Sequence, residues 1–210
     1  MFTISDGVRE SEASWKELLL GMRDRGMTED PKLAVADGAL GFWKALPQVF
    51  PTTKLQRCWV HKTANVLDTL PKSVQPRAKT LIHDIYLAET KTAANKAFDH
   101  FCESYRDRYT KTVEKLEKDR DELMTFYQFP AAHWKHIRST NVIESVFATV
   151  RLRTYKTKGL GTRNATLAMT FKLVQEAEKG WHKIAKWQQL ELVQAGRVFR
   201  DGELVEKAAA

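Results

Sequence analysis

Residues 33–38 have the sequence Leu-Ala-Val-Ala-Asp-Gly, a short apolar run that ends in a turn dipeptide. Four apolar residues shortly after Pro31 are typical of a buried strand, and Asp37-Gly38 is a strong turn signal. The neighbouring segments continue the alternation as a helix at 39–46, a strand at 54–60 and a helix at 61–70. Strands that alternate with helices favour a parallel α/β layer.

We expect a strand and a helix upstream of this stretch. Residues 2–5 have the length and composition of a short strand, which Asp6-Gly7 would turn. Ser11 is the expected N-cap of the following helix, and Gly26 is expected to end it. The apolar side chains with helical spacing on one face of that helix are Trp15, Leu18, Leu19 and Met22.

The middle of the chain has a different character. Residues 78–129 contain no glycine and no proline, and their apolar residues keep helical spacing. This pattern predicts an all-helical block of two or three helices. Three further helices are expected at 141–153, 164–179 and 181–193, and the last residues are expected to fray.

The composition excludes several classes of protein. Ten Phe, six Trp and five Tyr in 210 residues exclude a disordered chain, and two cysteines, Cys58 and Cys102, exclude a disulfide scaffold and suit a reducing compartment. No apolar run approaches the roughly 18 to 20 residues of a membrane-spanning helix, and residues 1–7 lack the features of a signal peptide. With a net charge of +8 and a pI near 9.4, we expect a soluble cytoplasmic protein with a polyanionic partner, most simply nucleic acid.

Most of the positive charge lies in one stretch. Between residues 135 and 163 there are seven Lys or Arg and one acid, Glu144, so this stretch carries +6 of the net +8. Such a concentration favours contact with nucleic-acid phosphates over an ordinary solvated basic surface. The residues predicted to bind DNA are Arg138, Arg151, Arg153, Lys156, Lys158 and Arg163.

Two carboxylates are candidate site residues, and each has a plain structural alternative. Asp37 follows directly on a predicted strand, where open α/β sheets place ligands, but an Asp-Gly pair also simply makes turns. Glu144 has the spacing of a capping box with Asn141. It also has Ala148 and Arg151 one and two turns further along the same helical face, as a metal site beside a phosphate would require.

Other motifs give weaker signals. Cys58 and His61 have zinc-like spacing, but a structural zinc site needs four ligands, so we expect them to organise a strand–helix junction through hydrogen bonds. A Cys/His nucleophilic pair is the other alternative. The glycine loop at 157–161 follows no strand and lacks the end of a P-loop, so it suits close approach to DNA phosphates better than a nucleotide. The aromatic and basic residues at 133–136 suit either core packing or stacking on a base.

Several motifs together resemble those of bacterial Mutator-type insertion-sequence transposases. They occur in the order seen in that family and cover essentially the whole chain. The matching stretches are residues 11–15 (Ser-Glu-Ala-Ser-Trp), 37–38 (Asp-Gly), 49–51 (Val-Phe-Pro), 56–58 (Gln-Arg-Cys) with His61, 139–145 (Ser-Thr-Asn-Val-Ile-Glu-Ser), 147–154 and 157–159.

The resemblance implies a ribonuclease H-like catalytic domain with an Asp-Asp-Glu triad that holds two Mg²⁺ ions. Asp37 matches the second aspartate of the triad and Glu144 its glutamate, and Cys58 with His61 matches a motif near the active site. The implied reaction is hydrolytic release of a DNA strand, followed by attack of its 3′-hydroxyl on target DNA. Implied partners are transposon ends, target DNA and further transposase copies.

The resemblance also divides the chain. It implies an α/β part of the catalytic core at 1–72, a helical insertion at 73–130, core helices with the basic DNA-facing segment at 131–195, and a tail at 196–210. The family carries its first aspartate upstream of the segment that this chain matches, and Asp6 cannot be assumed to replace it.

Three expectations follow from that departure. The chain corresponds to the C-terminal part of such a transposase, it does not transfer strands alone, and an unpaired sheet edge makes it marginally stable. The alternatives are a non-catalytic DNA-binding remnant that regulates full-length transposase, and a small helical nucleic-acid-binding protein whose carboxylates only cap helices.

Overall fold

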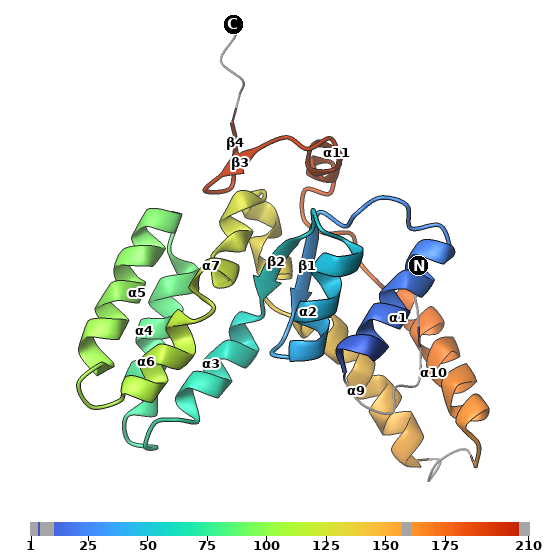
Figure 1. The fold of residues 1–210 in the computed structure, drawn as a ribbon, viewed down its shortest axis with the longest axis horizontal. Helices are drawn as coiled ribbons and strands as arrows, with labels where there is room; N and C mark the ends of the chain where they lie inside the picture. The colour runs from blue at the N-terminus through green and yellow to red at the C-terminus, as the bar shows by residue number, and fades with distance from the viewer. Residues whose placement is uncertain (1–3, 5–10, 157–160, 206–210) are drawn as a thin grey trace, which may run out of the picture. The chain divides into compact units, whose positions relative to one another are not determined.

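The computed structural model describes residues 4, 11–156 and 161–205, and helices dominate it (Figure 1). The chain divides into two compact units. Unit 1 is drawn from Met1–Pro31, Ala39–Thr53 and Asn141–Lys183, and unit 2 from Lys32–Gly38, Lys54–Thr140 and Ile184–Ala210. The strand expected at 2–5 and its turn at Asp6-Gly7 lie outside the described residues, apart from Ile4.

Unit 1 is helical in its described residues. Its helices are α1 (Glu12–Asp24), α2 (Leu40–Val49), α9 (Asn141–Lys156) and α10 (Arg163–Glu178), which pair as α1 with α2 and α9 with α10. The predicted start of α1 is confirmed, because the Ser11 hydroxyl accepts a hydrogen bond from the Ser14 N–H at 3.2 Å. Gly26, just past the helix, has a φ of +100°, which a glycine adopts without strain.

The sheet of unit 2 begins with the stretch Leu33–Ala36, which forms β1 as predicted. Its parallel partner β2 (Lys54–Arg57) pairs with it in register from Leu33 opposite Lys54 to Ala36 opposite Arg57 (Figure 1). The predicted strand at 54–60 is too long, because helix α3 (Trp59–Leu67) already begins at Trp59. A short apolar run does not distinguish a strand from a buried helical turn.

The all-helical block is confirmed, with more and shorter helices than predicted. It contains α4 (Gln75–Leu87), α5 (Lys91–Tyr105), α6 (Thr110–Glu117), α7 (Arg120–Leu123) and the 3₁₀ helix η1 (Thr125–Gln128). Helices in this block begin and end without glycine or proline, because other side chains can cap them. The Thr90 hydroxyl, for example, accepts a hydrogen bond from the Ala93 N–H at 3.1 Å and caps the start of α5.

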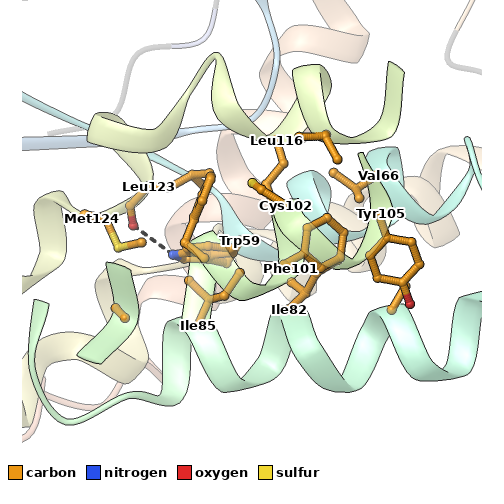
Figure 2. Packing of buried hydrophobic residues seen from close by; sticks show 14 of the residues in the cluster. Trp59, Val66, Ile82, Ile85, Phe101, Cys102, Tyr105, Leu116, Leu123 and Met124 are labelled. Atoms are coloured by element: carbon orange, nitrogen blue, oxygen red, sulfur yellow. Dashed lines mark hydrogen bonds between the residues drawn. The ribbon is translucent and has the colours of Figure 1, made fainter. Parts of the chain in front are cut away.

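The core of unit 2 joins α3 to this block (Figure 2). Trp59 is 1% exposed, and its indole N–H donates to the Leu123 carbonyl at 2.8 Å. Cys102 lies in the same core, where burial raises the pKa of its thiol to about 11. Cys102 is therefore a packing residue rather than a reactive thiol.

The end of unit 2 differs from the prediction. After η2 (Ala131–His133) and α8 (Trp134–Ile137), helix α11 spans only Gln189–Gln194 of the helix expected at 181–193. Strands β3 (Phe199–Arg200) and β4 (Glu203–Leu204) then form an antiparallel hairpin within the range expected to be a tail. No helix in the described part of the chain is long and apolar enough to cross a membrane.

Candidate active site

The carboxyl end of the β1–β2 pair brings Asp37 and Cys58 together. Each residue directly follows its strand, and the Cys58 N–H donates to the Ala36 carbonyl at 2.9 Å. The Arg57 guanidinium then donates to the Asp37 carbonyl at 2.7 Å. Asp37 is exposed at this edge, which is where open α/β sheets place their ligands.

Cys58, His61 and Thr140 form a cluster beside this strand end. The Cys58 Sγ accepts from both the backbone N–H and the hydroxyl of Thr140 at 3.3 Å. His61 Nδ1 lies 3.2 Å from the same sulfur and 3.3 Å from the Thr140 hydroxyl. The predicted hydrogen bonding at the strand–helix junction is therefore present, and Thr140 is a partner that sequence spacing did not reveal.

The zinc alternative for Cys58 and His61 lacks ligands. Within residues 11–156 and 161–205, no group of three or more His, Cys, Asp or Glu side chains could hold a metal ion. The buried sulfur, 1% exposed, instead accepts the hydrogen bonds from Thr140.

Behind the strand end lies a buried ionic cluster that the sequence did not predict. Asp119, between α6 and α7, forms an ion pair with Lys62 of α3, and its other oxygen lies 3.5 Å from the Arg57 guanidinium. Lys62 also donates to the Lys115 carbonyl at 2.9 Å. Burial lowers the pKa of Lys62 below its usual value, and the hydrogen bond that Lys62 donates to Asp119 opposes part of that shift.

Of the two predicted metal ligands, Glu144 belongs to unit 1 and Asp37 to unit 2. Glu144 is half-buried in the first turns of α9. The predicted capping box required Asn141 as the N-cap, but Asn141 is the first residue of α9. Thr140 then precedes the helix, and Glu144 is the fourth helical residue, one position beyond the third residue that a capping box uses.

The predicted DNA-binding residues fall into three groups. Arg151, Arg153 and Lys156 are exposed on α9, and Arg163 is exposed at the start of α10. Arg138 instead lies in unit 2, where it donates to the Tyr86 carbonyl at 2.8 Å and its guanidinium sits 5.1 Å from the Tyr86 ring centroid. Lys158, with residues 157–160 of the glycine loop, lies outside the described residues.

The aromatic–basic stretch at 133–136 packs within unit 2. Trp134 contacts the rings of Phe126 and Tyr127 edge-on at 5.3 and 4.8 Å, and its indole N–H donates to the Phe129 carbonyl. His133 is only 2% exposed. Core packing is therefore confirmed for His133 and Trp134, and stacking on a base stays a prediction.

Sequence comparison identifies the family to which these residues belong. Residues 2–184 match the family described as "Transposase, Mutator family". The chain belongs to the Mutator family of transposases. The predicted resemblance is therefore confirmed over most of the chain.

Named relatives of this Mutator-family chain include transposases of bacterial insertion sequences. It is 51% identical over 199 residues to the transposase for element IST2 of Acidithiobacillus ferrooxidans, covering 95% of this chain and 67% of that protein. It is 51% identical over 207 residues to the transposase for IS6120 of Mycolicibacterium smegmatis, covering 99% and 64%. Identity to the transposase for IS905 of Lactococcus lactis is 34% over 147 residues, covering 70% and 37%. The chain thus spans about two thirds of the length of the first two relatives.

Proposed function

We propose that this Mutator-family chain supplies part of the catalytic centre of a DNA transposase. In this proposal the β1–β2 pair belongs to a ribonuclease H-like core, and residues 73–130 are an insertion within it. The centre cleaves a DNA strand and joins the freed 3′ end to target DNA. The observation that carries the proposal is the exposed carboxylate of Asp37 at the end of β1, beside Cys58 at the end of β2, in a chain of this family.

The residues available fit a divalent cation in part. Carboxylate oxygens are the hard ligands that Mg²⁺ prefers, and we propose Asp37 and Glu144 as two of them. The third carboxylate that the family resemblance implies is not assigned within this chain. When bound, a Mg²⁺ pair activates the attacking oxygen of a phosphoryl transfer and stabilises the leaving one.

The protein's own groups would hold these ligands in place. Arg57 fixes the backbone at Asp37 through the Asp37 carbonyl. The Cys58 sulfur fixes Thr140, the residue that directly precedes α9. The cluster of Cys58, His61 and Thr140 is therefore proposed to support the site rather than to react.

The DNA partner is proposed to lie along the basic residues. Exposed Arg151, Arg153 and Lys156 of α9 and Arg163 of α10 would contact phosphates, which positions DNA without selecting its sequence. Lys158 and Arg138 stay in this proposed set, the latter through guanidinium N–H groups other than the one that donates to Tyr86. Joining two transposon ends would require association of transposase copies.

The test uses a longer transposase that carries this chain together with the upstream aspartate-bearing segment that the family resemblance implies. We expect Asp37→Ala and Glu144→Ala each to abolish Mg²⁺-dependent strand cleavage and to leave DNA affinity unchanged. Asp68→Ala and Glu178→Ala remove exposed carboxylates from the same two units and serve as controls. Unchanged cleavage by Asp37→Ala would overturn the proposal.

A further inference from the structure

The buried ionic cluster behind the strand end connects the helical block to Asp37. Asp119 is 8% exposed and forms ion pairs with two cations of the α/β part, Lys62 on α3 and Arg57 at the end of β2. Arg57 uses one guanidinium nitrogen toward Asp119, at 3.5 Å, and the other toward the Asp37 carbonyl, at 2.7 Å. Arg57 therefore bridges a carboxylate of the helical block and the backbone of the proposed metal ligand.

We propose that Asp119 is a positioning residue for Asp37, acting through Arg57. This inference rests on the proposed function, in which Asp37 binds metal. Asp119 sets the orientation of the Arg57 guanidinium, and that guanidinium sets the orientation of the peptide unit after Asp37. A planar guanidinium suits this role, because its donors point in fixed directions on two sides.

The place of Asp119 itself is well determined. Lys62 holds one of its carboxylate oxygens and at the same time donates to the Lys115 carbonyl, so α3 and α6 fix the carboxylate together. The adjoining Gln56, fully buried on β2, accepts from the Phe126 N–H at 2.8 Å and donates to the Leu123 carbonyl at 3.2 Å. These contacts hold the end of β2 in a fixed position relative to the helical block.

Stability alone is a weak explanation for this cluster. Two cations and one carboxylate lose hydration when they are buried, and replacing a buried ion pair by apolar residues is often neutral or stabilising. A cluster that costs desolvation but orients a backbone carbonyl beside an exposed carboxylate serves positioning. The helical block is then a brace for the proposed active site as well as a packing partner.

The first test reads the Asp37 carbonyl directly, in this chain without metal or DNA. With ¹³C-labelled protein, we expect the carbonyl chemical shift of Asp37 to move in Arg57→Lys and in Asp119→Asn, in the same direction, because both weaken the hydrogen bond to that carbonyl. Tyr127→Phe is the matched control, since it removes the partly buried hydrogen bond from the Tyr127 hydroxyl to the Ala88 carbonyl elsewhere in unit 2 and should leave the Asp37 signal in place.

The second test uses the same longer transposase. We expect Asp119→Asn to lower the cleavage rate at saturating DNA roughly ten- to hundredfold, as a misplaced catalytic group does, with the DNA dissociation constant unchanged. If Asp119→Asn does not fold, Asp119→Glu keeps the charge for Lys62, and the same shift of the Asp37 signal is expected.

An Asp37 signal that moves in Arg57→Lys but stays fixed in the Asp119 variants would overturn the inference. Failure of the proposed function gives a different result: Asp37→Ala would remain active, whatever the carbonyl signal does.

Discussion

At Gly202 both the backbone conformation and the space around the residue require a glycine, and a substitution can test this. It forms the β3–β4 turn with a φ of +83°, and a Cβ there would lie 2.5 Å from the Ala131 Cβ. The close approach exists because the Ala131 N–H donates to the Gly202 carbonyl at 3.0 Å. The hairpin is thus fastened to the rest of unit 2 at a point where only glycine fits.

We predict that Gly202→Ala lowers the free energy of unfolding by roughly 2–4 kcal/mol, from left-handed strain plus the clash with Ala131. Gly196→Ala is the control, because Gly196 also has a positive φ, +71°, but has open space where its Cβ would be. It should cost only about 1 kcal/mol. Urea unfolding of both variants gives the comparison, and equal losses would contradict the clash.

His136 is a residue whose charge state should couple to stability. Burial lowers its pKa below the usual 6.5, with the charges of Lys135 and His133 adding to the shift. The unfolded chain therefore binds a proton more readily than the folded one, so stability is lost as the pH falls through about 6.5. Its Nε2 is buried without a hydrogen-bond partner in the part of the chain that the structure describes.

We predict that His136→Leu flattens the dependence of the unfolding free energy on pH between about 5 and 7, since the variant has no proton to take up there. The measurement is chemical denaturation of both proteins across that range, with His100→Leu on the exposed face of α5 as the control. If His136→Leu shows the same dependence of the unfolding free energy on pH as the wild type, the dependence does not come from His136.

At the scale of elements, the sequence predicts helices and strands correctly where their formation depends on local interactions alone. The Ser11 cap, β1 and the glycine-free helical block follow from capping, apolar runs and periodicity. The start of α3 does not, because Trp59 packs into the core of the helical block and its indole N–H donates to the Leu123 carbonyl, 64 positions away. The β3–β4 hairpin does have a local signal in the sequence, an Asp-Gly turn between Val-Phe-Arg and Glu-Leu-Val.

Strand β2 is joined to the helical block by one fully buried polar side chain. Gln56 donates to the Arg57 and Leu123 carbonyls at 2.7 and 3.2 Å and accepts from the Phe126 N–H. We predict that Gln56→Leu destabilises the protein by roughly 2–4 kcal/mol, because it leaves the buried Phe126 N–H without its acceptor.

Gln128→Leu, at an exposed position on η1, is the matched control for Gln56→Leu and should change stability by less than about 0.5 kcal/mol. Thermal or urea unfolding measures both. A loss at Gln56 as small as that at Gln128 would show that β2 does not depend on this junction.

At the scale of the whole molecule, the candidate site was predictable only where strand order dictates it. Parallel strands place Asp37 and Cys58 at one edge, and that follows from the α/β pattern. Thr140 meets Cys58 across 82 positions, and Asp119 meets Lys62 across 57. Such contacts come from tertiary packing, which no local pattern encodes. The metal and DNA roles of the predicted residues stay predictions.

The last prediction concerns which part of this positively charged chain contacts DNA. If the exposed basic residues of α9 contact phosphates, then changing Arg151, Arg153 and Lys156 to Gln should weaken DNA binding for every sequence tested. Each lost phosphate contact should reduce the slope of log affinity against log salt by about 0.9, so the triple variant should lose roughly 3. DNA binding by this chain, titrated at several salt concentrations, measures that slope.

The matched control separates location from net charge. Changing the exposed Lys72, Lys79 and Lys96 of unit 2 to Gln removes the same three charges from the net +8. If location decides, this control keeps nearly the full salt slope, because long-range attraction between separated charges is screened within about a Debye length. Equal losses in both triple variants would mean that DNA responds to the overall charge, and α9 would then have no special place in binding.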